Sequence, residues 1–275
     1  MRLKLIFLFT ICNSLFVFAS TVDTVFVVSN SMNKSISNIV IVPDNYSTQK
    51  EGFSVLYLLH GAGGNHTDWL SDIPSIREYA DEYNIIIVCP DGGATSWYFD
   101  SPIDEKMKYE TYISKELISA IDKKYNTLDK NTNRAITGYS MGGHGAFYLA
   151  FKHPDVWGAA GSIHGGLDIR PFPNNWDIHK RLGDYSKYKE NWEKNTVVNM
   201  VNRLDGKNLK LIFDCGVDDF FYNENRRFHE KLVERNIPHD YIERPGGHDW
   251  DYRSNSIKYQ LIFFSDYFKL YQNNP

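Results

Sequence analysis

Short apolar runs alternate with helix-like segments along almost the whole of this chain. Two of the runs, residues 55–59 and 85–88, are continuously apolar, which is typical of strands that helices cover on both faces. Such short runs suit strands better than helices. Eight strands are predicted, at residues 24–29, 37–42, 53–60, 85–90, 134–139, 157–163, 209–215 and 240–244.

Helical patterns fill the intervals between several of these strands. They cover residues 75–83, 110–125, 143–152 and 223–235. In the second of them apolar residues recur at every fourth position, at Ile113, Leu117, Ile121 and Tyr125. Helices between successive strands are the usual connections of a parallel sheet. The chain is therefore predicted to be an α/β protein, with a mostly parallel eight-stranded sheet and helices on both faces.

No repeat or low-complexity linker divides the chain after residue 19, so residues 20–275 are predicted to form a single domain. Hydrophobic residues make up 42% of the chain and charged residues 23%, which is the balance of a soluble globular protein. One segment, residues 165–205, lacks a regular period but is rich in aromatic residues. We interpret it as an insertion over the carboxyl edge of the sheet.

Residues 1–19 resemble a signal peptide, with basic Arg2 and Lys4, an apolar core, and a small residue at Ala19. The protein is therefore expected to be exported, periplasmic or secreted, and bacterial. A buried N-terminal helix and a lipid anchor on Cys12 are the alternatives. Loss of Arg2 and Lys4 would change the net charge from −4 to −6, which argues against nucleic acid or anionic lipid as a partner. No stretch is long and apolar enough to predict a membrane span.

The candidate nucleophile is Ser140, in the sequence Gly-Tyr-Ser-Met-Gly of residues 138–142. This G-x-S-x-G pattern follows a predicted strand and precedes a predicted helix, which is the context of a nucleophile elbow. Glycines two positions away on each side allow the tight turn, and a helix N-terminus lies beside the serine oxygen.

A glycine-rich loop, His-Gly-Ala-Gly-Gly at residues 60–64, follows the strand that ends at Leu59. Attack on an ester places negative charge on the carbonyl oxygen, which backbone N–H groups must stabilise. The oxyanion hole is assigned to the backbone N–H groups of Ala62 and Met141.

A histidine must accept the serine proton, and an acid must orient that histidine. Of the nine histidines, only His248 lies in a glycine-rich loop after the last predicted strand. The chain order serine, acid, histidine places the acid upstream. Asp214, Asp218 and Asp219 all lie at the end of the strand at residues 209–215, with Asp214 inside it, whereas Asp249 adjoins the histidine and is excluded. Asp214 is expected to serve the backbone of its own loop.

Taken together, these segments resemble the esterase D-like family of α/β-hydrolases, which includes feruloyl esterases, acetylxylan esterases, S-formylglutathione hydrolases and mycolyltransferases. The matching pieces are residues 59–64, 90–93, 109–113, 138–146, 153–155, 214–216 and 246–249. The resemblance implies eight strands and places the acid three residues after Gly216, at Asp219. It also implies that Cys89 and Cys215 lie on separated strands and are free thiols. One departure is His164, where many relatives have serine.

The resemblance is strongest to feruloyl and acetylxylan esterases. Formylglutathione hydrolases are typically cytosolic and have a different oxyanion segment with a cysteine, whereas this chain has a predicted signal peptide and the Ala-Gly-Gly segment. The predicted function is a serine carboxylesterase that needs no metal or cofactor and acts on a small-molecule or oligosaccharide ester. An acyltransferase to a sugar hydroxyl, or a non-catalytic carbohydrate-binding homologue, are the alternatives. Trp97 is predicted to stack on the substrate, with a core position as its alternative. The sequence leaves the acyl group, the alcohol and the oligomeric state open.

Overall fold

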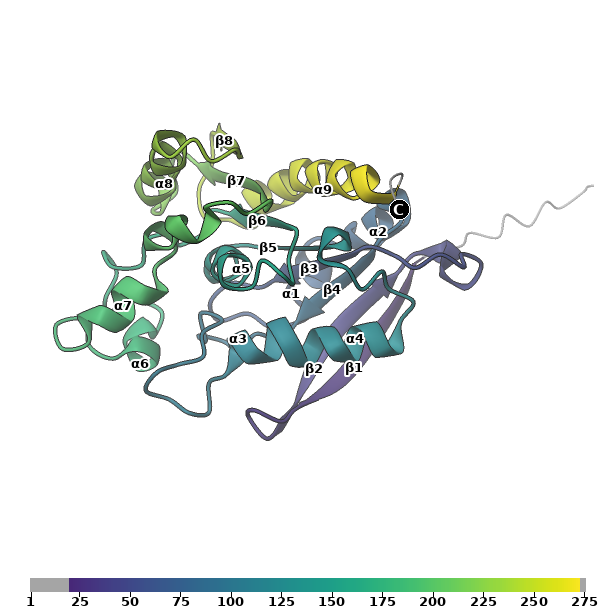
Figure 1. Ribbon diagram of the computed structural model, residues 1–275, viewed down its shortest axis with the longest axis horizontal. Coiled ribbons are helices and arrows are strands. Elements are labelled where there is room, and N and C mark those ends of the chain that lie inside the picture. The colour runs from purple at the N-terminus through teal and green to yellow at the C-terminus, as the bar shows by residue number, and fades with distance from the viewer. Residues whose placement is uncertain (1–19, 273–275) are drawn as a thin grey trace, which may run out of the picture.

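The protein is described here by a computed structural model that covers residues 20–272. The predicted leader and Cys12 lie outside the described residues. All eight predicted strands form one sheet, in the order β1-β2-β4-β3-β5-β6-β7-β8 (Figure 1). Their bounds are β1 Thr21–Ser29, β2 Lys34–Val42, β3 Val55–Leu59, β4 Ile86–Pro90, β5 Arg134–Gly138, β6 Ala159–Ile163, β7 Lys210–Gly216 and β8 Asp240–Arg244.

The sheet is parallel except at one edge. Strand β2 pairs antiparallel with both β1 and β4, and every other pair is parallel. Parallel strands end at the same edge, so the loops after β3, β5, β7 and β8 can meet there. This topology brings together segments that lie far apart in the sequence.

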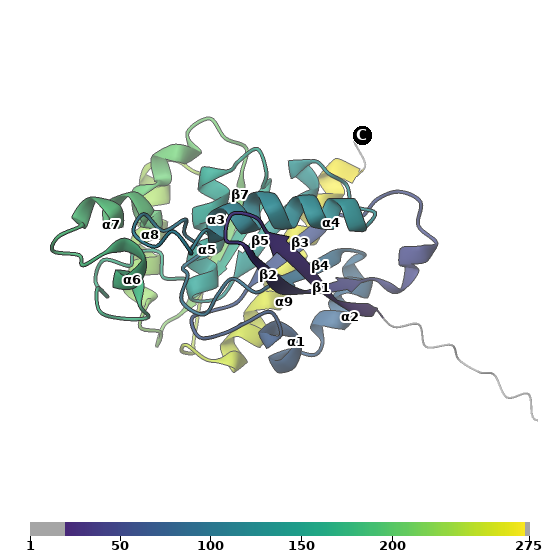
Figure 2. The same cartoon turned by 90° about the horizontal axis from the view of Figure 1, so that it is seen from below.

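Helices cover both faces of the sheet, and strands β3, β4, β5 and β6 are buried along their whole length. In β3, Val55, Tyr57 and Leu59 face one core, whereas Leu56 and Leu58 face the other. This alternation follows from the two-residue period of a strand. Figure 2 shows the sheet between α4 on one side and α1 and α2 on the other. The predicted α/β-hydrolase architecture is confirmed.

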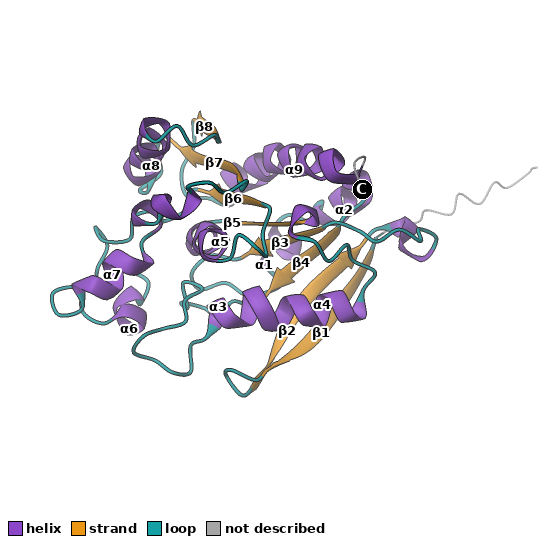
Figure 3. Cartoon of the chain, in the orientation of Figure 1, coloured by secondary structure: helices purple, strands orange, loops and turns teal. Residues whose placement is uncertain are grey.

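The helical segments differ in length and regularity (Figure 3). The α-helices are α1 Asp68–Asp72, α2 Ile76–Tyr83, α3 Tyr109–Thr111, α4 Ile118–Lys124, α5 Met141–Lys152, α6 Ile178–Leu182, α7 Lys189–Asn195, α8 Tyr222–Glu234 and α9 Trp250–Gln272. A wider π-helical stretch, Tyr112–Leu117, joins α3 to α4. Short 3-10 turns lie at Asp44–Ser47, Asn131–Asn133, Val197–Asn199 and Val201–Leu204. The four predicted helices are therefore confirmed, with ends that differ by one or two residues.

The long helix α9 was not predicted from the sequence. Its buried residues Ile257, Leu261, Phe264 and Phe268 are spaced three or four apart and pack on the sheet beside α2. The helix could have been predicted from this three- and four-residue spacing of apolar residues. Because α9 starts just after His248, its first turn helps to fix the position of that histidine.

The two cysteines of the described residues are buried free thiols, as predicted. Cys89 lies in β4 and Cys215 in β7, and three strands separate these two. Among residues 20–272, no helix combines the length and apolar character that crossing a membrane requires.

Candidate active site

Ser140 sits on a sharp turn between β5 and α5. Its backbone is left-handed, with φ 58° and ψ −119°, a conformation that non-glycine residues rarely adopt. The flanking glycines allow this turn. A Cβ atom at Gly138 would lie 2.6 Å from the Leu59 carbonyl oxygen, and one at Gly142 would lie 2.5 Å from the same atom. The strained turn therefore projects the serine hydroxyl beyond the carboxyl edge of the sheet.

His248 lies on the loop between β8 and α9, directly beside this serine. Its Nε2 is 2.9 Å from Ser140 Oγ, and its Nδ1 is 2.7 Å from Asp219 Oδ2. With Nδ1 protonated toward the carboxylate, Nε2 is free to accept the serine proton. The structure thus brings together the three residues that the sequence proposed.

Asp219 is held by contacts on both of its carboxylate oxygens. Its Oδ1 accepts the backbone N–H of Phe221 at 2.7 Å, while Oδ2 faces His248. Burial by itself would raise the pKa of Asp219, but hydrogen bonds from His164 and His248 outweigh burial and hold the pKa well below its usual range. The carboxyl group is therefore ionised at neutral pH.

The other three aspartates have different places. Asp218 is exposed, and Asp249 Oδ1 accepts the backbone N–H of Tyr252 at 2.8 Å, so it caps the first turn of α9. The buried Asp214 carboxylate binds the side chains of Ser256 and Gln260 on α9, at 2.5 Å and 2.9 Å. The expectation that Asp214 serves its own loop backbone was wrong, because helix α9 covers it.

The two proposed oxyanion donors come from different segments of the chain. Ala62 follows β3 and lines the same cleft as Ser140, and Met141 is the first residue of α5. Within the part of the chain that the structure describes, their backbone N–H groups donate to no protein acceptor. Both N–H groups are thus available to a ligand.

A cleft of about 500 Å³ opens above Ser140 and His248. Aromatic rings of Trp176, Phe220 and Trp250 line it, and Trp176 and Phe220 are stacked with ring centroids 5.5 Å apart. Asp68 and Asp72 also line the cleft. Because Trp176 belongs to the 165–205 segment, at least this part of the segment reaches the carboxyl edge, as expected.

Trp97 is not on the wall of this cleft, which corrects the expectation that it stacks on the substrate. Only 1% of the residue is exposed, and its ring packs on His144 with centroids 5.3 Å apart. Its indole N–H donates to the carbonyl oxygen of Trp176 at 3.1 Å. Trp97 therefore supports Trp176 from inside the core, and of these two indoles only Trp176 lines the cleft.

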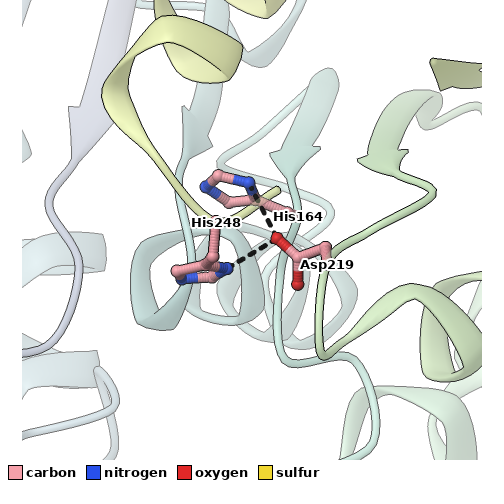
Figure 4. A group of neighbouring side chains, drawn as sticks. All are labelled: His164, Asp219 and His248. Atoms are coloured by element: carbon pink, nitrogen blue, oxygen red, sulfur yellow. Dashed lines mark hydrogen bonds and ion pairs between the residues drawn. The ribbon is translucent and has the colours of Figure 1, made fainter. Parts of the chain in front are cut away.

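His164, which was not among the predicted site residues, also contacts Asp219 (Figure 4). Its Nδ1 lies 3.2 Å from Asp219 Oδ2, in a contact too bent for an ideal hydrogen bond. The only feature of the sequence that pointed to His164 was its difference from many relatives, which have serine at this position.

The two imidazoles and the carboxylate of this cluster are a possible set of metal ligands. The Nε–H of Arg253 donates to His164 Nε2 at 2.8 Å, which leaves the proton of the neutral ring on Nδ1. His248 Nδ1 is also protonated toward Asp219. A metal ligand needs a lone pair on these nitrogens, so the cluster is better described as a hydrogen-bonded group.

The chain is similar to known esterases in sequence and in structure. The family model named Esterase matches residues 29–264. An esterase of Mycobacterium tuberculosis is 31% identical over 235 residues, which are 76% of this chain and 51% of that protein. An acetyl esterase of Caldicellulosiruptor saccharolyticus is 29% identical over 249 residues, covering 83% of this chain and 92% of the relative.

Among solved structures, a ferulic acid esterase superposes with a TM-score of 0.79 at 29% identity, covering 91% of this chain and 99% of the other. This chain spans about half the length of the mycobacterial esterase but nearly all of the acetyl esterase and the ferulic acid esterase.

Proposed function

This chain belongs to the Esterase family, and on that premise we propose that it hydrolyses feruloyl or acetyl esters of plant cell-wall carbohydrate through an acyl-enzyme at Ser140. The observation that carries the proposal is the continuous chain of hydrogen bonds from Ser140 through His248 to Asp219. The acetyl esterase and ferulic acid esterase relatives support this choice of substrates.

The first half of the reaction forms the acyl-enzyme. Ser140 Oγ attacks the ester carbonyl carbon while His248 Nε2 takes the hydroxyl proton. The carbonyl oxygen becomes an oxyanion and accepts hydrogen bonds from the N–H groups of Ala62 and Met141. His248 then donates its Nε2 proton to the alcohol oxygen as the bond from carbon to that oxygen breaks. The alcohol leaves, and the acyl group remains on Ser140.

The second half repeats these steps with water. His248 takes a proton from a water molecule, whose oxygen attacks the acyl carbon. The same N–H groups stabilise the second oxyanion, and the proton returns from Nε2 to Ser140 Oγ as the carboxylic acid leaves. Asp219 stays ionised throughout and offsets the positive charge that His248 carries in each half.

The walls of the cleft support a flat or hydroxylated substrate. Trp176 and Phe220 offer aromatic faces on which a hydroxycinnamoyl ring or a sugar ring can stack. Asp68 and Asp72 offer carboxylate oxygens that accept hydrogen bonds from sugar hydroxyls. These two carboxylates also disfavour anionic leaving groups such as glutathione, because like charges repel.

The proposal is tested by acyl release from feruloylated and from acetylated xylo-oligosaccharides, with Ser140→Ala as the control. We expect release by the wild type, none by the variant, and modification of Ser140 alone by phenylmethylsulfonyl fluoride in peptide mass spectra. Labelling of another serine, or equal release by Ser140→Ala, would contradict the nucleophile. Transfer of the acyl group to an added sugar in preference to water would favour a transferase.

We also propose that the protein is exported and that residues 1–19 are removed. The support is the pattern of Arg2, Lys4, the apolar core and Ala19 in the sequence. The mature protein is expected to begin at Ser20. Intact mass and N-terminal sequencing of the protein from a bacterial periplasm or medium test this, and retention of residues 1–19 would contradict it.

A further inference from the structure

A second histidine, His164, lies behind the proposed triad. It follows β6, is fully buried, and has a left-handed backbone with φ 34°. Its ring stacks on the His248 ring, with centroids 4.1 Å apart and planes 24° from parallel. The proton transfer from Ser140 to His248, which Asp219 supports, does not use His164. Because His164 is buried, it does not reach the cleft. A buried polar ring in a strained conformation at this point needs an explanation.

The protonation of His164 follows from its neighbours. Burial lowers the pKa of His164 to about 3, so the ring is neutral at ordinary pH. A neutral imidazole has one N–H and one lone pair. Arg253 has only N–H groups to offer, and its Nε–H occupies the Nε2 lone pair of His164 at 2.8 Å. The remaining proton must therefore be on Nδ1, which faces Asp219 Oδ2 at 3.2 Å.

Arg253 is itself held in place. Its guanidinium carbon lies 4.2 Å from the ring centroid of Tyr139 and 4.7 Å from that of Trp250, and one of its NH2 groups donates to the His248 carbonyl oxygen at 3.3 Å. Because Tyr139 adjoins the nucleophile, Arg253 connects three segments of the site. It is thus well placed to fix the tautomer of His164.

The His248 ring is enclosed on both faces. The Phe220 ring lies 4.2 Å from it and is tilted by 32°, and the His164 ring lies 4.1 Å away. Two rings this close and this nearly parallel cannot share one face of an imidazole, so His248 lies between them. Rotation of His248 away from Ser140 would have to displace one of these neighbours.

We propose that His164 is a positioning residue, fixed by Arg253 as the Nδ1–H tautomer, whose N–H faces Asp219 Oδ2 in a bent contact of 3.2 Å and whose ring holds the His248 ring in line with Ser140. The inference rests on the proposed function, since it assigns a role in the same reaction. His164 acts through Asp219 and His248 and does not touch the substrate. It should therefore affect kcat and leave KM unchanged.

Two variants of nearly the same shape separate the N–H group from the volume of the side chain. In His164→Asn the amide nitrogen can occupy the place of Nδ1, and asparagine tolerates a left-handed backbone. His164→Leu has the same branching without a donor. We expect His164→Leu to lower kcat by about 10- to 100-fold, the range for a lost hydrogen bond to a charged group. His164→Asn should keep a kcat about tenfold above that of His164→Leu.

Steady-state kinetics on p-nitrophenyl acetate measure both effects, and circular dichroism confirms that each variant is folded at the assay temperature. KM should stay within about twofold of the wild type in both variants, because neither changes a group that lines the cleft. Equal kcat in folded His164→Asn and His164→Leu would overturn the proposed donor role. A rise in KM without a fall in kcat would overturn the positioning role.

A second measurement is independent of turnover. In the protein labelled with 15N-histidine, NMR should show His164 at pH 7 as a neutral ring with its proton on Nδ1, and the His164→Asn spectrum assigns the signal. A ring protonated on Nε2, or on both nitrogens, would overturn the inference. If the wild type hydrolyses no ester, the proposed function fails whatever the tautomer. If Ser140 is reactive and His164→Leu matches the wild type, only this inference fails.

Discussion

Replacing Asp219 with asparagine tests the acid of the triad, because the structure leaves an amide no satisfactory orientation there. The carboxylate accepts N–H groups on both sides: Phe221 N–H on Oδ1 and His248 Nδ1–H on Oδ2, each at 2.7 Å. An asparagine has one oxygen and one NH2 group. Whichever way it is turned, its NH2 group meets an N–H donor.

The two orientations have different consequences. If the NH2 group faces His248, the ring must move its proton to Nε2 and can no longer accept the proton of Ser140. If it faces Phe221, a buried backbone N–H loses its acceptor at a cost of about 1–3 kcal/mol. In serine proteases the same change of aspartate to asparagine lowers kcat by about 10⁴-fold, or about 5.5 kcal/mol in activation free energy. We expect a loss of that order in Asp219→Asn.

The matched control is Asp218→Asn, one residue earlier on the same loop. Asp218 is exposed, so its loss should change kcat/KM by no more than about twofold. Hydrolysis of p-nitrophenyl acetate gives both rates, and thermal unfolding shows whether the variants are folded. A folded Asp219→Asn enzyme with more than a tenth of wild-type activity would refute the assignment. A larger loss in Asp218→Asn than in Asp219→Asn would refute it equally.

Four further predictions address the cleft, the core, the pH dependence of stability and the need for a metal. Trp176→Ala should reduce release from feruloylated oligosaccharides more than hydrolysis of p-nitrophenyl acetate, and equal losses would exclude stacking. Trp97→Ala should instead lower the free energy of unfolding by about 3–5 kcal/mol, measured by denaturant titration, because it empties a core site. Burial by itself would raise the pKa of Glu110, but hydrogen bonds from His153 and Lys152 outweigh it and lower the pKa to about 2. The stability that this carboxylate adds is therefore present above about pH 4.5 and lost as the pH falls toward 2. Glu110→Gln should cost about 3 kcal/mol at pH 7 and flatten the acid dependence of unfolding, and an unchanged dependence would contradict this. Dialysis against EDTA should leave the rate unchanged, and a loss that a divalent ion restores would show that a metal is required.

The sequence by itself was enough for the architecture and for Ser140 and His248 of the proposed triad. Strand positions follow from apolar runs because strands buried on both faces admit few polar side chains. Ser140 is recognisable because its turn requires glycine at residues 138 and 142, a purely local requirement. The acid was harder to identify, because three aspartates lie at the end of β7. Only the resemblance to a family distinguished Asp219 from the other two.

The walls of the cleft and the support behind the triad were decided by the tertiary structure. The substrate contact was assigned to Trp97 from the sequence, and only the tertiary structure shows that Trp97 is buried and that Trp176, in the 165–205 segment, lines the cleft. His164 and Arg253 are 89 positions apart, yet their contact fixes the tautomer of a ring beside Asp219. Local patterns carry no information about such a contact, because it depends on which strands become neighbours and on how α9 packs against them.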